Sequence, residues 1–169
     1  MKKILLVITI SFLLPNNFFG QSGKTIAQNS VTENTFSKSY SYLNDFEKIL
    51  TSNQIATLNT TLKSSEKKSG HKIIVVTISS IKPYASVPEY AYYLEKYLSD
   101  NLKLNPAILI VLSKELRQIQ IQSSRKGLNK LTEEETKNII NNFAIPEFKK
   151  GDFYKGLENA VNQIVKKIE

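Results

Sequence analysis

The sequence predicts an α/β/α sandwich, in which amphipathic helices cover both faces of a central mixed β-sheet. Two apolar runs, at 72–79 and 107–112, are rich in β-branched residues and lack a helical period, as buried strands do. A third run, at 117–122, alternates apolar and polar residues, as a half-exposed strand does. Three other segments repeat apolar residues at helical spacing behind a capping-box pair. Helices and strands that alternate in this way favour a single layered domain.

The N-terminal residues are predicted to lie outside that domain. Two lysines precede an apolar run at 4–14, which is the layout of a secretory signal peptide with cleavage between Gly20 and Gln21. The run is shorter than the ~20 residues that span a bilayer. An uncleaved N-terminal anchor is the alternative interpretation. The expected organisation is therefore a signal peptide at 1–20, a flexible lead at 21–39 and one domain at 40–169.

Composition excludes several classes of site. The chain has no Cys and a single His, His71, so disulfides and thiolate metal sites are excluded and a zinc site is not expected. No second long apolar run follows, so the mature chain is expected to carry no transmembrane helix and to be exported, either periplasmic or secreted. The net charge is +8, but the lysines are scattered. Because nucleic-acid interfaces cluster basic and aromatic residues, we expect no nucleic-acid binding.

The first two helices carry clear start signals. Thr51 and Gln54 have capping-box spacing, and Gly70 marks the end of the helix that follows them. After the strand at 72–79, Ser86 and Glu89 have the same spacing and begin a second helix. Four tyrosines lie on this second helix, and helical spacing favours core packing over a sugar- or base-stacking platform for all but Tyr92: they are Tyr90, Tyr92, Tyr93 and Tyr97.

The rest of the chain predicts a hairpin and two more helices. Because the strands at 107–112 and 117–122 are separated by a very short turn, they must pair antiparallel. Thr132 and Glu135 begin a third helix, which is expected to end near Pro146. A last helix begins around Asp152, a natural helix cap. Its inner face is predicted to contain Leu157, Val161, Ile164, Val165 and Ile168.

The acidic residues offer the main opening for chemistry, since the chain has no Walker loop, no GxGxxG and no Gly-x-Ser-x-Gly turn. Asp100 lies in a polar turn, where solvation suffices to explain it. Asp45 is different, because it lies among apolar residues just before the first helix. A carboxylate there either accepts hydrogen bonds from backbone amides or helps to hold a hard cation, and the sequence leaves both alternatives open.

Several stretches together resemble the TPM domain family. They are LNDFEKILTSNQIATLNTTLKSSEKKSGHKIIVVTI, PEYAYYLEKYL, NPAILIVL, IQIQ and the closing GLNKLTEEETKNIINNFAIPEFKKGDFYKGLENAVNQIV. The resemblance covers residues 42–168 and is specific in order and spacing. It implies an α/β/α sandwich and export or membrane attachment. Some members of the family are described as acid phosphatases with a cation pocket at one edge of the sheet, and others as non-enzymatic partners in assembling or repairing membrane complexes.

The resemblance also suggests a degraded metal site. The early family acid is kept as Asp45, but the acid before the second apolar strand is replaced by Leu104, beside Asn105. The acid of a later loop is replaced by Asn129. Asp45, Asn105 and Asn129 would be the remaining ligands. Because affinity at oxygen sites depends on the number of charged ligands, we expect that no cofactor is required and that calcium or magnesium binds only weakly.

The loop that carries Asn129 is also basic. Arg125, Lys126 and Gly127 would oppose a cation, and could instead form an anion site or a partner-binding loop. Against the anion site, acids already occupy the first turn of the helix that follows. The expected function is therefore an exported accessory module that binds an unidentified protein, which the family implies can be membrane-associated. The alternative is a weak, metal-associated acid phosphatase that hydrolyses phosphomonoesters.

Overall fold

The computed structural model describes residues 35–124 and 131–169. The predicted signal peptide, its cleavage site at Gly20 and Gln21, and the loop from Arg125 to Asn129 lie outside the described residues. Residues Phe36–Glu169 form one compact unit, and all that follows concerns this unit.

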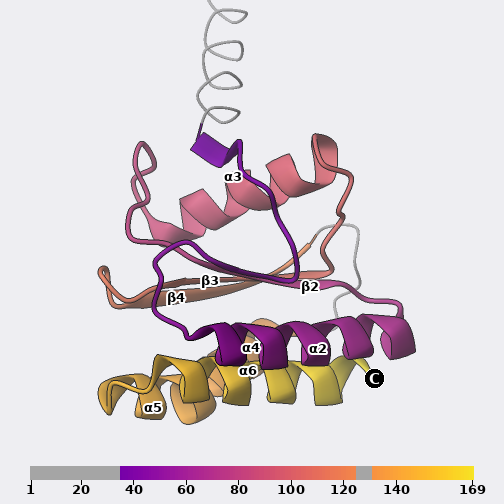
Figure 1. Cartoon of the computed structure of the whole chain (residues 1–169), viewed down its shortest axis with the longest axis vertical. Coiled ribbons are helices and arrows are strands. Elements are labelled where there is room, and N and C mark those ends of the chain that lie inside the picture. Colours follow the sequence, from indigo (N-terminus) through magenta and orange to yellow (C-terminus); the bar gives the residue numbers. More distant parts are fainter. Residues whose placement is uncertain (1–34, 125–130) are drawn as a thin grey trace, which may run out of the picture. The chain divides into compact units, whose positions relative to one another are not determined.

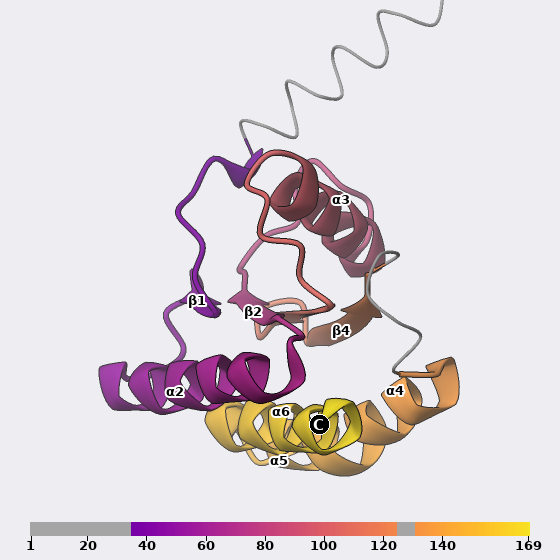
Figure 2. The same cartoon turned by 90° about the vertical axis from the view of Figure 1, so that its right-hand side faces the viewer.

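The sheet has four strands in the spatial order of the sequence, and Figure 2 shows it end-on. They are β1 (Leu43–Asp45), β2 (Ile73–Thr77), β3 (Ile108–Ser113) and β4 (Gln118–Ser123). The pairs β1·β2 and β2·β3 are parallel, whereas β3·β4 is the predicted antiparallel hairpin. The sheet is therefore mixed, with β1 and β4 as its two edge strands.

Helices cover both faces of this sheet, which confirms the predicted α/β/α sandwich (Figure 1). One face is covered by α3 (Val87–Asp100). The other is covered by α2 (Ser52–Ser69) and by the C-terminal elements α4 (Glu133–Ile139), η1 (Ile140–Ala144), α5 (Ile145–Lys149) and α6 (Phe153–Ile168). Because successive strand residues point to opposite faces, β2 and β3 supply both cores: Val75 and Ile110 face α2 and α6, whereas Val76 and Val111 face α3.

The predicted helix starts are confirmed at atomic detail. Thr51 and Thr132 each accept a bond from the third helical amide, and the partner residues Gln54 and Glu135 return one to the cap amide. Ser86 caps α3 in the same way, but the Glu89 carboxylate accepts the amide of Ala85 instead. Gly70 ends α2 with a left-handed φ of 73°, and Asp152 caps α6.

Three features differ from the sequence prediction. The strand β1 was not predicted, because three residues are too few to show a period. The third helix, α4, does not end near Pro146, because a π-helical turn, η1, follows it. Pro146 lies in the first turn of the next helix, α5, where a missing N–H costs no helical bond. Finally, Phe36 lies within the lead predicted to be flexible, yet it is fully buried among Tyr84, Tyr90 and Tyr97.

Candidate functional site

The carboxyl end of the parallel strands is the usual ligand crevice of an α/β sheet, and here it holds Asp45. The Asp45 carboxylate accepts the backbone amides of Ile49 at 3.2 Å and Leu50 at 2.8 Å, and also the hydroxyl of Thr77 on the neighbouring strand. These bonds close the turn between β1 and α2. Of the two alternatives that the sequence left open for Asp45, the structure therefore shows the bonding to backbone amides.

A second carboxylate at the same edge is also occupied. Glu47 accepts the amides of Lys114 at 2.9 Å and Glu115 at 2.8 Å, which ties the β3–β4 hairpin to the turn after β1. The amide of Glu47 in turn donates to the Thr77 hydroxyl at 3.1 Å. The carboxylates of Asp45 and Glu47 and the hydroxyl of Thr77 thus link β1, β2 and the β3–β4 hairpin at the carboxyl end of the strands. Glu47 could not be singled out from the sequence, because its partners are backbone groups that leave no residue pattern.

Two of the three predicted metal ligands, Asp45 and Asn105, lie within the described residues, and they lie at opposite ends of the sheet. Asp45 lies level with Thr77 at the carboxyl end of the strands, whereas Asn105 precedes Ile108 at the opposite end. The sheet alone separates these ends by roughly 13 Å, at about 3.3 Å per residue. Asn105 has a φ of 42°, and its side-chain amide donates to the Lys103 carbonyl at 3.0 Å. Asn129 lies outside the described residues, so Asp45 and Asn105 by themselves do not form one site.

The other acidic groups of the described residues are dispersed. Within 35–124 and 131–169, no three His, Asp or Glu side chains gather closely enough to hold an ion. The remaining aspartates serve local roles: Asp152 caps α6, and Asp100 is exposed at the end of α3.

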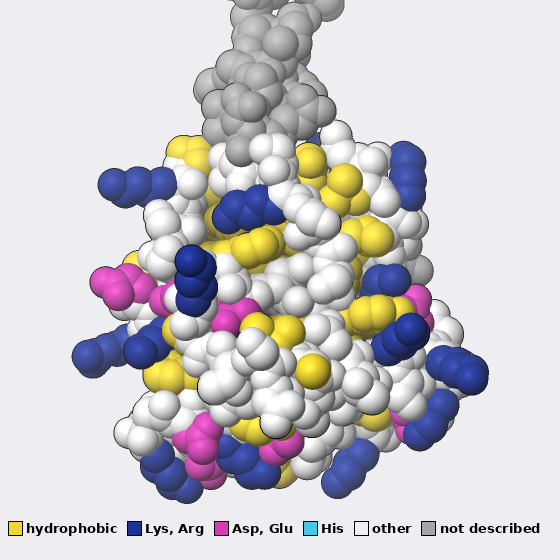
Figure 3. All heavy atoms as spheres, viewed as in Figure 1, with side chains coloured by type: hydrophobic (Ala, Val, Ile, Leu, Met, Phe, Trp, Pro, Cys, Tyr) yellow, Lys and Arg dark blue, Asp and Glu magenta, His cyan; other side chains and the backbone are white. Residues whose placement is uncertain are grey.

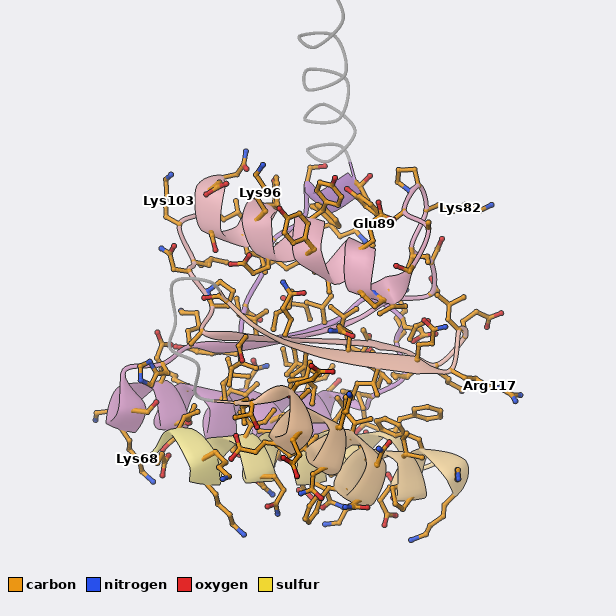
Figure 4. The ribbon with its side chains drawn as sticks, turned by 180° about the vertical axis from the view of Figure 1, so that it is seen from behind. Lys68, Lys82, Glu89, Lys96, Lys103 and Arg117 are labelled. Atoms are coloured by element: carbon orange, nitrogen blue, oxygen red, sulfur yellow. The ribbon has the colours of Figure 1, made fainter. Side chains whose placement is uncertain are left out.

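An open cleft of about 1060 Å³ lies beside β4. Figure 4 views the molecule from this side, with β4 running between α3 and the C-terminal helices. The cleft is lined by the first turn of α3, by the hairpin residues 112–115, and by residues 117–120. Its opposite wall is apolar and comes from η1, α5 and α6, chiefly Ile140, Ile145, Phe148 and Phe153.

The rim of this cleft is basic. Lys114, Arg117 and Lys149 line it, and Glu115 is the only acidic residue among the described lining. The ammonium group of Lys114 lies 5.5 Å from the centre of the Phe153 ring, a cation–π contact. Among the described residues, none of the three bases takes part in an ion pair. The cleft therefore combines an apolar wall with uncompensated positive charge.

Basic residues elsewhere are distributed differently. On the face drawn in Figure 3, Lys and Arg side chains are spread around the surface among acidic and uncharged side chains, with several close together at the lower right. Several pair with acids, such as Lys68 with Glu169 and Lys72 with Glu66. This scatter is what solvated surface lysines produce.

The tyrosines of α3 agree with their prediction, because Tyr90 and Tyr97 are buried while Tyr92 is 37% exposed.

Comparison with known proteins identifies the family. The model of a family described as the TPM domain matches residues 43–167, which is most of the chain. The chain belongs to the TPM domain family. No curated protein matches it.

Solved structures share the fold of this TPM domain. An N-terminal domain from P. gingivalis is 22% identical, with a TM-score of 0.67 over 80% of this chain and 86% of that one. The BA42 protein of the psychrophilic bacterium Bizionia argentinensis is 21% identical, with a TM-score of 0.57 over 73% and 83%. An N-terminal domain from Corynebacterium glutamicum is 15% identical, with a TM-score of 0.53 over 94% and 88%. At these identities the likeness concerns the fold alone.

Proposed function

We propose that this TPM domain is an exported accessory module that acts by binding another protein, and that its divalent-cation pocket is degraded. The observation that carries the proposal is how the polar groups are used. At the carboxyl edge of the strands, Asp45 and Glu47 are engaged by backbone amides. The open cleft beside β4 adjoins this place through the hairpin, and its described lining contains no His and no cluster of acids.

Export is part of the same proposal. The apolar run at 4–14 and the junction between Gly20 and Gln21 support it. Within the described residues, no helix is long and apolar enough to cross a membrane. Sequencing the N-terminus of the protein recovered from its native cells tests this step: a start at Gln21 is expected, and a start at Met1 would contradict cleavage.

A phosphatase assay separates this role from the enzymatic alternative. We expect a chromogenic phosphate monoester to be hydrolysed no faster than in buffer, with calcium, with magnesium or with a chelator. The Asp45→Asn variant preserves the shape of the side chain and serves as the control. Metal-dependent hydrolysis by the wild type that Asp45→Asn abolishes would refute the accessory role in favour of the enzyme.

Site-specific photo-cross-linking in the native host tests the binding role directly. Leu116, in the β3–β4 hairpin, and Leu102, after α3, are similarly exposed at 37% and 36%. A photoreactive residue at Leu116 is expected to give a discrete cross-linked protein adduct, whereas the same residue at Leu102 is not. Discrete adducts from neither position, nor from Tyr92 on α3, would contradict a protein-binding function.

A further inference from the structure

The edge strand β4 has backbone groups that its own sheet does not use. The amide of Ser124 donates to the Ala107 carbonyl at 2.9 Å, which fixes the phase of the hairpin ladder. Because hydrogen-bonding direction alternates along a strand, Gln118, Gln120 and Gln122 bond to β3. Ile119 and Ile121 therefore direct their N–H and C=O groups away from the sheet.

These outward groups lack backbone partners in the described structure. β4 pairs only with β3, and no other backbone bond within 35–124 and 131–169 reaches Ile119 or Ile121. Among the residues that the structure describes, the Ile121 carbonyl accepts one weak bond, from the side-chain amide of Gln120 at 3.4 Å. The opposite edge strand, β1, differs from β4 because a side chain of the domain binds its backbone: the Leu43 amide donates to the side chain of Asn59 at 3.0 Å.

The residues of β4 itself are not of the kinds that usually protect a free edge. Proteins commonly guard an edge with charged residues, proline or a bulge on the strand itself, and all six residues of β4 are uncharged, with no proline. Instead, residues 118–120 form the floor of the cleft, between the start of α3 and the apolar wall of α5 and α6. At about 1060 Å³, the cleft lies at the upper end of the ~300–1,000 Å³ typical of small-ligand pockets, and it is large enough to hold several residues of an extended chain.

The charged residues around the cleft indicate which kind of partner it binds. Lys114, Arg117 and Lys149 outnumber Glu115 around the cleft, and within the described residues none of the three is in an ion pair. A second copy of this chain would bring the same basic rim against itself, which like-charge repulsion disfavours. An acidic segment would neutralise the rim, because carboxylates pair with Arg and Lys.

We infer that the β4 edge binds an extended acidic segment of a partner protein by β-strand addition. The segment pairs with the backbone of Ile119 and Ile121, sets alternate apolar side chains against the wall formed by Phe148 and Phe153, and places its carboxylates near the basic rim. This inference rests on the proposed protein-binding function and specifies its partner class.

Synthetic peptides test the inference with the full chain. Three kinds of peptide serve as probes. The first is an acetylated heptapeptide of alternating Glu and Val, and the second has Lys in place of Glu. The third is the acidic peptide with alternate backbone amides N-methylated, along one or the other edge of the peptide strand. Calorimetry is expected to show binding of the acidic peptide, and binding at least about 10-fold weaker for the others, because they lack charge complementarity or backbone donors. Hydrogen exchange should show protection of the Ile119 and Ile121 amides by the acidic peptide alone.

Two sets of variants locate the site. Ile119→Pro removes an outward N–H while leaving the ladder bonds of its neighbours, which is the one arrangement an edge strand tolerates, and Ile119→Val is its control. Arg117→Glu with Lys149→Glu reverses the rim. Lys96→Glu with Lys103→Glu is matched in charge at the far end of α3 (Figure 4), and Lys103 shares the positive φ of Arg117, 57° against 53°.

Each outcome of these experiments either supports or refutes strand addition at β4. Binding that Ile119→Pro and the rim reversal each weaken at least about 10-fold, while both controls retain it, supports strand addition. Absence of binding, or binding that N-methylation and Ile119→Pro leave unchanged, overturns it. A cross-linked partner captured from Leu102 and not from Leu116 would leave the protein-binding function standing and refute this site.

Discussion

Asp45→Ala is the most informative substitution, because it tests whether this acid is a structural cap or a metal ligand. The change removes the acceptor of two backbone amides, those of Ile49 and Leu50, and of the Thr77 hydroxyl. A hydrogen bond to a charged group contributes about 1.5–3 kcal/mol when it is well buried. Asp45 is half-buried, so in the variant water partly replaces the lost carboxylate as a partner of these donors. We therefore expect each lost hydrogen bond to lower the free energy of unfolding by about 1 kcal/mol.

The expected loss in free energy of unfolding is therefore about 3 kcal/mol for Asp45→Ala. It should be smaller for Asp45→Asn, which keeps one acceptor oxygen. At roughly 3–5 °C per kcal/mol for a domain of this size, the alanine variant should melt about 10 °C lower. Urea unfolding followed by circular dichroism measures the loss, and an unchanged m-value would show that both states remain comparable.

The decisive condition is calcium. A structural cap predicts the same loss in a chelator and in millimolar calcium chloride, because the lost partners are the chain's own amides. Asp100→Ala, an exposed acid at the end of α3, is the control and should change stability by less than about 0.5 kcal/mol. A loss confined to calcium, or calcium stabilising the wild type and not the variant, would refute the reasoning and restore Asp45 as a metal ligand.

Three further predictions concern the cores. Phe36→Ala should cost about 3–5 kcal/mol by urea unfolding, because the ring is fully buried. Gly156→Ala should destabilise by about 1–3 kcal/mol despite alanine's helix propensity, since the added Cβ would lie within 3 Å of the Phe148 ring. Burial raises the pKa of the Tyr40 and Tyr90 phenols, so they ionise first in the unfolded chain. Stability should therefore fall above about pH 10, by up to about 1.4 kcal/mol per pH unit for each phenol.

Each of these predictions has a control. Tyr92→Ala changes an exposed aromatic residue and should be nearly neutral, and a loss below about 1 kcal/mol for Phe36→Ala would contradict the burial of that ring. Asn162→Ala lies on the exposed side of the helix that contains Gly156 and should be neutral. In alkaline unfolding, Tyr90→Phe should flatten the decline with pH, and an unchanged slope would show that its phenol ionises alike in both states.

Much of the fold could be predicted because its signals are local. The bonds of Thr51 with Gln54 and of Thr132 with Glu135 depend only on residues three positions apart. The short turn between β3 and β4 forces the antiparallel pairing for the same reason. The errors occurred where tertiary contacts override local preference: Phe36 is held by residues some fifty positions away, and β1 exists only because β2 supplies its ladder.

The candidate site divides in the same way. The sequence singled out Asp45, and the structure shows what it bonds. It could not reveal Glu47, whose partners are hairpin amides almost seventy residues away. Nor could it separate Asp45 from Asn105, because the two differ in the end of the sheet at which they lie, and that depends on strand direction.

The sequence by itself determined most of the helices and strands of this protein, its fold class and its family, because periodicity, caps and turn lengths act over a few residues. Only the tertiary structure decided which polar groups are used and which are available. Hydrogen bonding between distant segments occupies the carboxylates at one edge of the sheet, whereas strand order leaves the backbone of Ile119 facing an open, basic cleft. Both outcomes depend on which segments the packed core brings together.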